Sequence, residues 1–322
     1  MIINCPQCGS HIDWDKTKSC LKGHAVRAVA DIPLCFTPDD ILVKKTADPY
    51  YPLEHAIGIA EKLALADTCR QAIDIFFDIH EAELNKDLTL AKKLFTNRQV
   101  SEVNDCIADG SLFFDKIGKP FPSNDRFHID IGCGVGHGLV SSSKSYFGPN
   151  VIGIDLSPHY LTMAKLLLKE HGVAADNLVC ADICEGWPFP LEKYDISFIS
   201  MEGVLEHIEH TDNFFATVKK IKSYPFAIYL TVPYRWSIHP ESHFNMRFIG
   251  WLPKILQDRY IAWRRGANKI VHVELYSISS LRQTLERYFT SGSIAIELND
   301  NQPFKHHYLR CLIYINDANC FK

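Results

Sequence analysis

The pattern of apolar and polar positions divides the chain into regions of different texture. From about residue 126 onward, short apolar runs of strand length alternate with segments whose apolar residues recur at helical spacing. This alternation predicts an α/β fold, a doubly wound and mainly parallel sheet covered by helices. The expected strands are 127–131, 150–155, 177–181, 194–200 and 226–232, followed by a helix at 279–289 and a terminal antiparallel hairpin at 294–298 and 309–315.

The chain before residue 126 contains two regions that differ in composition and in apolar spacing. Residues 1–45 are rich in turns and cysteines, whereas residues 46–125 are mostly of helical pattern, most clearly from Ile57 to Phe77. Residues 119–125 have the proline and polar content of a linker. We therefore expect a small N-terminal module at 1–45, a helical cap region at 46–125 and an α/β domain at 126–322 with a long insertion at about 234–275.

The composition fits a globular protein with a sizeable core. Of 322 residues, 47% are hydrophobic and 22% are charged, and the formal net charge is −4. This balance does not favour nucleic acid as a partner, although a local basic patch could still bind RNA. We expect no transmembrane segment and no signal peptide, because the necessary apolar runs are absent from the sequence. Eleven cysteines without an export signal favour reduced thiols and a cytoplasmic location.

A glycine-rich turn joins the first strand of the α/β region to the next helix. Its glycines permit a tight turn and a close approach of backbone N–H groups to a ligand. Asp155 ends the second strand, where a carboxylate can accept both hydroxyls of a ribose. Asp182 ends the third strand, where an acid can accept from an adenine amino group. The turn reads Asp130, Ile131, Gly132, Cys133, Gly134, Val135 and Gly136.

These motifs and the stretch from Met201 to Ile208 resemble the class I S-adenosylmethionine (SAM)-dependent methyltransferases over about residues 126–233. The resemblance implies a Rossmann-like fold, SAM as cofactor and methyl transfer as the activity. In that family the glycine loop, the acid after strand two and the acid-apolar pair after strand three hold the cofactor. Carried to this chain, the cofactor-binding residues are Asp130, Gly132, Cys133, Gly134, Gly136, Asp155, Leu156, Asp182, Ile183 and Met201.

A nicotinamide-binding Rossmann domain is the main rival interpretation of this loop. Its fingerprint has a glycine at the sixth position, where this chain has His137. The sequence also lacks a Tyr-x-x-x-Lys pair after the fourth strand that a dehydrogenase would use as acid and base. Both observations favour the methyltransferase interpretation.

The N-terminal cysteines are spaced for a metal. Cys5-Pro6-Gln7-Cys8 is a zinc-knuckle pattern, and the stretch from Cys20 to His24 supplies a second half one hairpin later. Three thiolates and an imidazole can close a tetrahedral structural zinc site, on which so small a module would depend for stability. His11 or Cys35 could replace His24 as the fourth ligand, and unliganded thiols or a redox Cys-x-x-Cys pair are alternatives. The expected ligands are Cys5, Cys8, Cys20 and His24.

This module resembles the N-terminal zinc finger of certain ribosomal-RNA guanine methyltransferases. It also resembles the zinc ribbon that precedes many bacterial methyltransferases and ends in a Gly-Ile-Pro turn. The corresponding turn here reads Ala30-Asp31-Ile32-Pro33, so the match is partial. The resemblance implies a structural zinc held by four protein ligands, without a role in activating a nucleophile.

The insertion combines positive charge with aromatic residues. It predicts an amphipathic helix from Pro253, and a segment of this kind can form a lid over the acceptor. It would suit a phosphate-bearing acceptor, RNA, or peripheral membrane contact through 247–269, and a solvated helix packed on the core is the plainer alternative. Within 247–269 the basic residues outnumber the single acid, Asp258; they are Arg247, Lys254, Arg259, Arg264, Arg265 and Lys269.

Methyl transfer from a sulfonium carbon is an in-line displacement, so the protein mainly positions the acceptor. An oxygen acceptor also needs a base of near-neutral pKa, for which histidine is suited. His207 is the first candidate because it follows the fourth strand, and Tyr234, His239, His243 and Glu202 come next. His239 and His243 could instead bind a metal, although Pro240 between them disfavours a regular helical pair.

We therefore expect SAM-dependent methylation, at oxygen, of a small-molecule or lipid- or sugar-linked acceptor. An RNA base methyltransferase that uses the zinc module for its substrate is the second hypothesis. The acidic net charge opposes it, and Ser200–Gly203 lacks the Asn-Pro-Pro-Tyr-type motif of many base-amine methyltransferases. A non-catalytic partner or scaffold protein is the third hypothesis, against which the intact loop and its acids argue.

Overall fold

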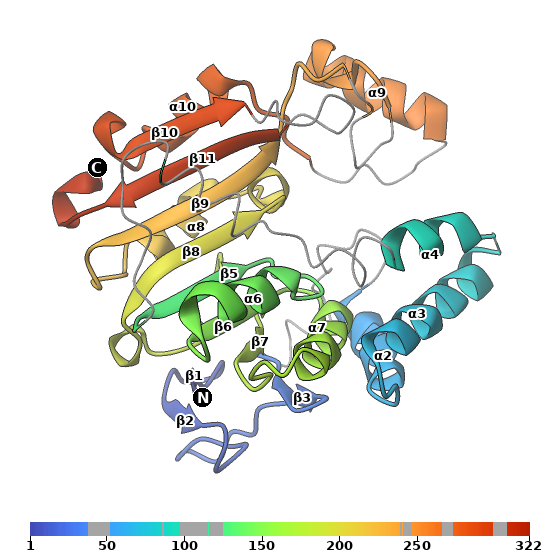
Figure 1. Cartoon of the computed structure of the whole chain (residues 1–322), viewed down its shortest axis with the longest axis vertical. Helices are drawn as coiled ribbons and strands as arrows, with labels where there is room; N and C mark the ends of the chain where they lie inside the picture. The colour runs from blue at the N-terminus through green and yellow to red at the C-terminus, as the bar shows by residue number, and fades with distance from the viewer. Residues whose placement is uncertain are drawn as a thin grey trace. The chain divides into compact units, whose positions relative to one another are not determined.

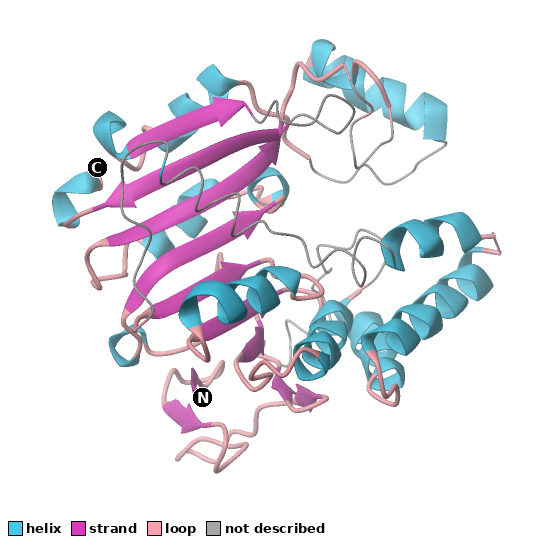
Figure 2. Ribbon diagram, viewed as in Figure 1, coloured by secondary structure: helices cyan, strands magenta, loops and turns pink. Residues whose placement is uncertain are grey.

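The computed structural model describes residues 1–37, 52–85, 87–96, 115, 125–238, 240, 246–265, 273–298 and 308–322. It divides into two compact units, Met1–Ser197 and Phe198–Lys322. Seven strands form one sheet in the order β10-β11-β9-β8-β5-β6-β7 (Figures 1 and 2), which confirms the predicted α/β, Rossmann-like class. Each predicted strand is present within two residues of its expected bounds. The strands are β5 (Phe127–Ile131), β6 (Val151–Asp155), β7 (Leu178–Cys180), β8 (Ile196–Glu202), β9 (Phe226–Pro233), β10 (Ile294–Leu298) and β11 (Tyr308–Ile315).

Three parallel strands of the first unit bring the cofactor motifs to one edge of the sheet. β5 pairs with β6 up to Ile131 and Ile154, and β6 pairs with β7 up to Asp155 and Cys180. All residues of β6 and β7 are buried, as is usual for parallel strands that are covered on both faces. Because the strands share one direction, the segments that follow them meet at their carboxyl ends.

A close approach at Gly153 fixes the packing behind these strand ends. The helix α6 (His137–Ser142) follows β5, and α7 (Pro158–Glu170) follows β6. A Cβ atom at Gly153 in β6 would lie only 2.6 Å from Leu139 Cδ1, 2.7 Å from Leu178 Cδ2 and 2.9 Å from Cys133 Sγ. Glycine is therefore the residue that lets α6, β7 and the glycine loop meet over β6.

The helical region contains three helices among its described residues. These are α2 (Leu53–Leu63), α3 (Cys69–Leu84) and α4 (Thr89–Thr96). The helical pattern from Ile57 to Phe77 is split at 64–68, where Thr68 caps α3 by accepting a hydrogen bond from Gln71 N at 3.1 Å. The apolar spacing runs across the turn because both helices pack against α7 (Figure 1).

The N-terminal module covers the outer edge of β7. After β4 (Ile32–Pro33) the chain runs beside β7, where Leu34 bridges Cys180 and Cys35 N donates to Cys180 O at 2.8 Å. An exposed strand edge is a template for unwanted pairing, and this contact removes it. The strands of the module are β1 (Ile2–Asn4), β2 (His11–Asp13), β3 (Ala28–Val29) and β4 (Ile32–Pro33).

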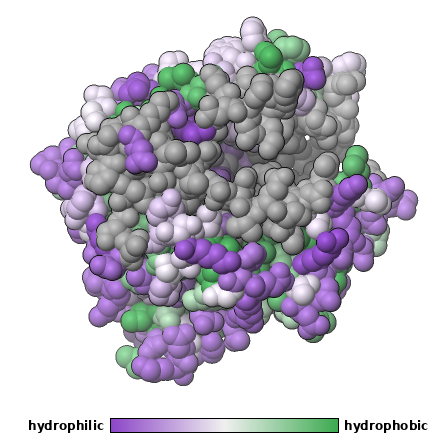
Figure 3. All heavy atoms as spheres, viewed as in Figure 1, coloured by the Kyte–Doolittle hydropathy of each residue, from purple (hydrophilic) through white to green (hydrophobic). Residues whose placement is uncertain are grey.

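Side chains of the α/β region hold the module from two sides. Lys165 of α7 donates to Ala30 O at 2.7 Å, in the turn between β3 and β4. Tyr194 bonds through its hydroxyl to the backbone N and O of Ile2, at 3.0 and 3.1 Å. Ala30 and Asp31 have φ of 49° and 60°, left-handed values that this two-residue turn requires even though alanine adopts them reluctantly. Over the module, at the bottom of Figure 3, the surface is mainly hydrophilic.

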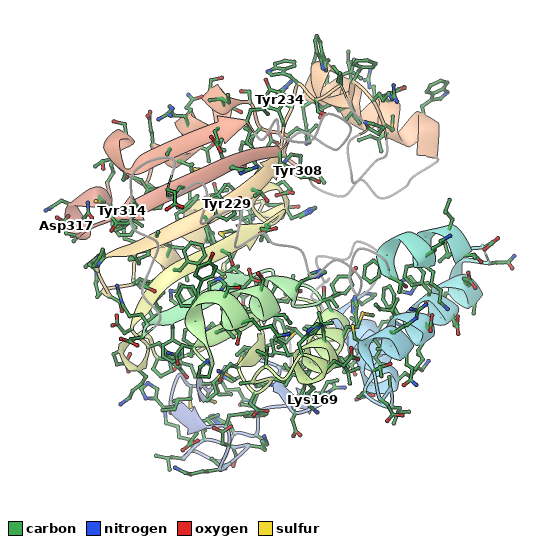
Figure 4. The ribbon with its side chains drawn as sticks, viewed as in Figure 1. Lys169, Tyr229, Tyr234, Tyr308, Tyr314 and Asp317 are labelled. Atoms are coloured by element: carbon green, nitrogen blue, oxygen red, sulfur yellow. The ribbon has the colours of Figure 1, made fainter. Side chains whose placement is uncertain are left out.

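The second unit carries the rest of the sheet. β8 and β9 are parallel, and β11 lies antiparallel to β9, with Tyr308 opposite Pro233 and Ile315 opposite Phe226. β10 and β11 form the predicted hairpin. Figure 4 shows Tyr229 in β9 and Tyr308 and Tyr314 in β11. The helices are α10 (Ile278–Leu285), which begins one residue before the predicted start and ends four residues before the predicted end, and α8 (Thr211–Val218), which the sequence analysis did not predict.

The described part of the insertion has a core of its own. Its helix α9 (Lys254–Arg265) confirms the prediction of a helix after Pro253. Arg235 ties the start of the insertion to its middle by donating to Gly250 O at 2.8 Å and Leu252 O at 3.3 Å. A Cβ at Gly250 would lie 1.9 Å from Arg235 O, so this contact requires glycine. The insertion core consists of Met246, Ile249, Ile261, Val273 and Leu275, with Tyr260 packed against it.

Two expectations drawn from composition can be compared with the described residues. None of the helices described there has both the length and the apolar character needed to cross a membrane. The ten cysteines in the same ranges form no disulfide with one another.

The packing at Gly153 predicts a difference between two glycine substitutions. Gly153→Ala should lower the free energy of unfolding by about 1–3 kcal/mol, because the added methyl overpacks the core. Gly58→Ala in α2 is the matched control. Its Cβ would have no neighbour within 4 Å, so it should raise the stability by up to about 1 kcal/mol through helix propensity. Urea unfolding followed by circular dichroism checks both, and equal midpoints would contradict the packing argument.

Candidate functional site

The glycine loop has the backbone conformation that its sequence predicts. Gly132, Gly134 and Gly136 have φ of 70°, 52° and 85°, in the left-handed region that side chains disfavour. The loop turns back against its neighbour strand, since Gly132 N donates to Ile154 O at 2.7 Å. A Cβ at Gly136 would lie 3.0 Å from the Cβ of Ala164, so this glycine also lets the loop approach α7. The loop thus presents backbone rather than side chains to the edge of the sheet.

Asp155 joins this loop to the start of α7. Its carboxylate accepts hydrogen bonds at 2.8 Å from Gly134 N and from Ser157 N, through different oxygens. The residue is buried, and desolvation raises the pKa of its carboxyl, although the backbone donors at Ser157, Gly134 and Leu156 act in the opposite direction. A carboxylate has about four acceptor positions, so both oxygens keep capacity for further donors.

The third strand end lies next to Asp155. Ala181 N donates to Asp155 O at 3.0 Å, which brings the following residues, Asp182 and Ile183, to the same edge. Asp182 is half-buried and its Oδ1 accepts from Cys184 N at 2.9 Å, while Ile183 is buried. A carboxylate acceptor and an apolar side chain therefore accompany the Asp155 carboxylate, a set that fits the amino group and ring of an adenine and the diol of a ribose.

The remaining predicted cofactor residues differ in their surroundings. Asp130, at the end of β5, is buried, and Leu156 is half-buried. Cys133 is buried in the loop, and burial raises the pKa of its thiol well above the usual value, so it stays protonated. Met201 is buried within β8 of the second unit. Within the first unit, the structure thus gathers the predicted loop and acid residues in one place.

The four predicted metal ligands come together in the N-terminal module. The ligand atoms of Cys5, Cys8, Cys20 and His24 all lie within 4.8 Å of one another. Cys5 Sγ is 3.8 Å from His24 Nδ1, and Cys8 Sγ is 3.8 Å from Cys20 Sγ. Thiolates at the usual Zn–S distance, placed tetrahedrally, lie about 3.8 Å apart. The donor set and its dimensions therefore fit a zinc ion.

Local turns place these side chains. Gly9 and Gly23 have φ of 71° and 81°, and each closes a turn by donating to the backbone of a cysteine, Cys5 O and Cys20 O, both at 2.8 Å. The Ser10 side chain, 3.1 Å from Cys8 Sγ, lowers the pKa of the Cys8 thiol to about 7. Such a thiol readily supplies the thiolate that a metal binds.

The alternative fourth ligands are placed elsewhere. His11 is exposed, with its Nε2 atom 3.7 Å from a carboxylate oxygen of Glu192. Cys35 lies beside β7, and desolvation raises the pKa of its thiol to about 12. His24 is therefore the fourth member of the cluster.

The candidate bases belong to the second unit, where two of them can be described. His207 is half-buried in the helical turn Leu205–His207 that follows β8. Tyr234 directly follows β9, and Figure 4 shows it near the end of that strand. Its backbone forms an isolated parallel β-bridge with Tyr276. Glu202 is exposed at the end of β8. The other two candidates, His239 and His243, lie outside the described residues.

One buried acid near these candidates was missed. Glu206 is fully buried beside His207, and its backbone O accepts from Glu274 N at 2.9 Å. Burial, with added repulsion from the acids at 274 and 206, raises the pKa of Tyr276 well above its usual value. The sequence showed an acid in this stretch but contained no signal for its burial, because the segment at 273–276 that covers it is distant in the chain.

Comparisons with known proteins identify a methyltransferase domain in this chain. Residues 129–222 match a family model described as a methyltransferase domain. The chain is 30% identical over 132 residues to a ubiquinone biosynthesis O-methyltransferase of Bartonella bacilliformis, which covers 40% of this chain and 51% of that protein. It is 33% identical over 96 residues to a protein of the same name from Cereibacter sphaeroides, covering 30% and 36%. The chain thus spans about half the length, or less, of these relatives.

A solved structure of phosphoethanolamine N-methyltransferase 2 from Haemonchus contortus is a distant structural neighbour. It has 16% identity and a TM-score of 0.43, and the match covers 65% of this chain and 52% of that one. The family match, the glycine loop and the strand order together identify a class I, Rossmann-like SAM-dependent methyltransferase domain in this chain.

Proposed function

We propose that the chain binds SAM at the glycine loop of its first unit and is an active methyltransferase. The observation that carries the proposal is the Asp155 carboxylate, held at the loop by the Gly134 N–H at 2.8 Å. Its remaining acceptor positions suit the ribose hydroxyls of the cofactor. Asp182 would accept from the adenine amino group and Ile183 would lie against the ring, with Asp130, Cys133, Leu156 and Met201 as further contacts.

The proposed acceptor is a hydroxyl oxygen on a small molecule or on a lipid- or sugar-linked metabolite. SAM supplies a methyl group on a sulfonium, so the protein has to orient the acceptor and take up its proton. His207, in the turn after β8, is the proposed base, and Tyr234, His239 and His243 are proposed to position the acceptor. The names of the curated relatives, which are O-methyltransferases, support oxygen as the acceptor atom.

We also propose that Cys5, Cys8, Cys20 and His24 hold one structural zinc ion. The cluster's donor set and its 3.8 Å spacings support this. The metal would join the two turns of a module that has little core of its own. In this scheme residues 1–45 are a zinc ribbon, 46–125 a helical cap and 126–322 the catalytic domain.

Calorimetric titration with S-adenosylhomocysteine tests the cofactor assignment directly. Binding, followed by release of S-adenosylhomocysteine from SAM in the presence of hydroxylated acceptors, is the expected result. Absence of binding to the folded protein would overturn the proposal. Turnover on RNA with no turnover on small acceptors would overturn the substrate class and leave the cofactor assignment intact.

Asp155→Asn should weaken S-adenosylhomocysteine binding by about 10- to 100-fold, because charge-assisted hydrogen bonds contribute about 1.5–3 kcal/mol. The side-chain amide of the asparagine also places its NH2 group, a donor, opposite one of the two backbone N–H donors, Gly134 N or Ser157 N. Asp176→Asn is the matched control, since Asp176 is exposed in the same unit and should leave the dissociation constant unchanged. Equal affinities in the two variants would remove Asp155 from the cofactor site.

His207→Gln should lower turnover by about 100- to 10,000-fold, the usual contribution of a general base. Binding of S-adenosylhomocysteine should stay at the wild-type level, because the imidazole is assigned to the acceptor and not to the cofactor. His210→Gln, at an exposed histidine three positions further on, is the control. Turnover in His207→Gln at the wild-type rate would eliminate this base.

Purified protein should contain about one zinc ion per chain by elemental analysis. Cys8→Ser should lose the metal and lower the thermal midpoint, since metal binding supplies folding free energy to small modules. Cys320→Ser changes a cysteine outside the cluster and should leave the zinc content and the thermal midpoint unchanged. Metal-free wild-type protein with an unchanged midpoint after chelation would contradict a structural zinc.

A further inference from the structure

The insertion in the second unit exposes large apolar side chains that its own core does not use. Its inward side chains, such as Ile249 and Ile261, already form the insertion core. We define the aromatic surface as the exposed residues Trp236, Arg247, Phe248, Trp251, Ile255, Arg259 and Trp263. Exposed patches of this kind on a folded protein usually mark a contact with a partner.

One half of this surface is a cluster of three rings at the base of the insertion. Trp236, Phe248 and Trp251 are 41%, 53% and 54% exposed. The ring centroid of Trp251 lies 5.6 Å from that of Trp236 and 6.4 Å from that of Phe248. The rings therefore form one group and are not scattered apolar positions.

Contacts of Arg235 connect this group to the backbone of the insertion. The Arg235 guanidinium bonds to the backbone at Gly250 and Leu252 and lies 5.1 Å from the Trp236 ring. Phe248 has a φ of 60°, a left-handed value that is costly for a bulky side chain. The chain thus keeps a phenylalanine exposed in a strained conformation, although asparagine or glycine would fit that backbone better.

The other half is the outward face of α9. Ile255 and Trp263 are 66% and 75% exposed, and exposed Arg259 lies between them at helical spacing. Gln257 and Ile261 are buried on the inward face. In Figure 1, α9 lies beyond the end of β9, and apolar atoms are visible over it at the top of Figure 3.

The charge of this part of the chain opposes that of the whole. Residues 246–265 have a formal net charge of +4, in a chain whose net charge is −4. Positive charge beside tryptophan and aliphatic side chains is the combination that binds at the headgroup level of an anionic bilayer. RNA-binding surfaces also contain basic and aromatic residues. RNA binding does not, however, account for the exposed aliphatic side chains of Ile238, Ile255 and Leu256, which are 53%, 66% and 44% exposed.

From these observations we propose that the aromatic surface docks the protein peripherally on an anionic lipid bilayer. Trp251, Phe248 and Trp263 enter the interface, and Arg247 and Arg259 contact the headgroups. This goes beyond methyl transfer, and it stands or falls independently of the acceptor.

Flotation of the full-length protein with vesicles tests the proposal. Phosphatidylcholine vesicles with about one third phosphatidylglycerol should bind the protein, and pure phosphatidylcholine vesicles should bind it much less. Three of the five tryptophans are in the exposed surface, so binding to vesicles with brominated acyl chains should also quench the intrinsic fluorescence. No binding to the anionic vesicles, or binding without quenching, would overturn the proposal.

Two variants separate the parts of the surface. Phe248→Asn with Trp251→Gln and Trp263→Gln should weaken binding by at least about tenfold through lost apolar burial. Arg247→Gln with Arg259→Gln should weaken it by about 30-fold on the anionic vesicles, the effect of two basic residues at such a surface. Leu65→Ser and Lys169→Gln are the controls, because both change exposed side chains of the first unit.

The folding of each variant is checked before its vesicle binding is compared. Thermal midpoints and S-adenosylhomocysteine binding at wild-type levels show which variants are folded, and only those are compared. If a folded aromatic variant bound vesicles as wild type does, the assignment of this surface would be wrong. Binding to tRNA that vesicles do not compete with would likewise replace the bilayer by RNA as the partner.

Discussion

The two hydrogen bonds that Asp155 accepts hold together the parts of the first unit on which the cofactor site depends. One comes from Gly134 in the loop after β5, and the other from Ser157 at the start of α7. Burial opposes the ionised carboxyl, and the backbone donors favour it. A single side chain at the end of β6 therefore joins the glycine loop to the next helix. Its remaining acceptor positions are the ones that we propose for the ribose hydroxyls.

Close packing supports this arrangement from behind. Gly153 lets α6 and β7 approach β6, and Gly136 lets the loop approach α7. At the far edge of these strands the N-terminal module pairs with β7, while Lys165 and Tyr194 bond to its backbone. A metal ion in the cysteine cluster would thus stabilise a module that is hydrogen-bonded to the strands and helix carrying the cofactor motifs. We infer that the module is a structural part of the first unit.

The insertion in the second unit has a buried face and an exposed apolar face. Its core is small, and contacts such as those of Arg235 with Gly250 and Leu252 hold its backbone. Its exposed side chains lie outside this core, although the Trp263 ring stacks on Tyr260, which packs against the core. The buried face of α9 stabilises the insertion. Its exposed apolar face is typical of an interaction surface, so the two faces of the helix have different roles.

The sequence by itself determined the strands, the alternation of strands and helices along the chain, the glycine loop and the cluster of Cys5, Cys8, Cys20 and His24. Each of these is encoded locally, by apolar runs bounded by turns, by glycines at left-handed positions and by cysteine spacing. Two of the three features that the sequence analysis did not predict depend on contacts between distant segments. α8 lacked a clear local signal, the turn at 64–68 was hidden because α2 and α3 both bury apolar residues against α7, and the burial of Glu206 depends on residues 273–276. Only the tertiary structure decided that Asp155 bonds to Gly134, that Lys165 holds the turn at Ala30 and which face of α9 stays exposed, because burial and hydrogen-bond partners are properties of the folded arrangement and not of residue spacing.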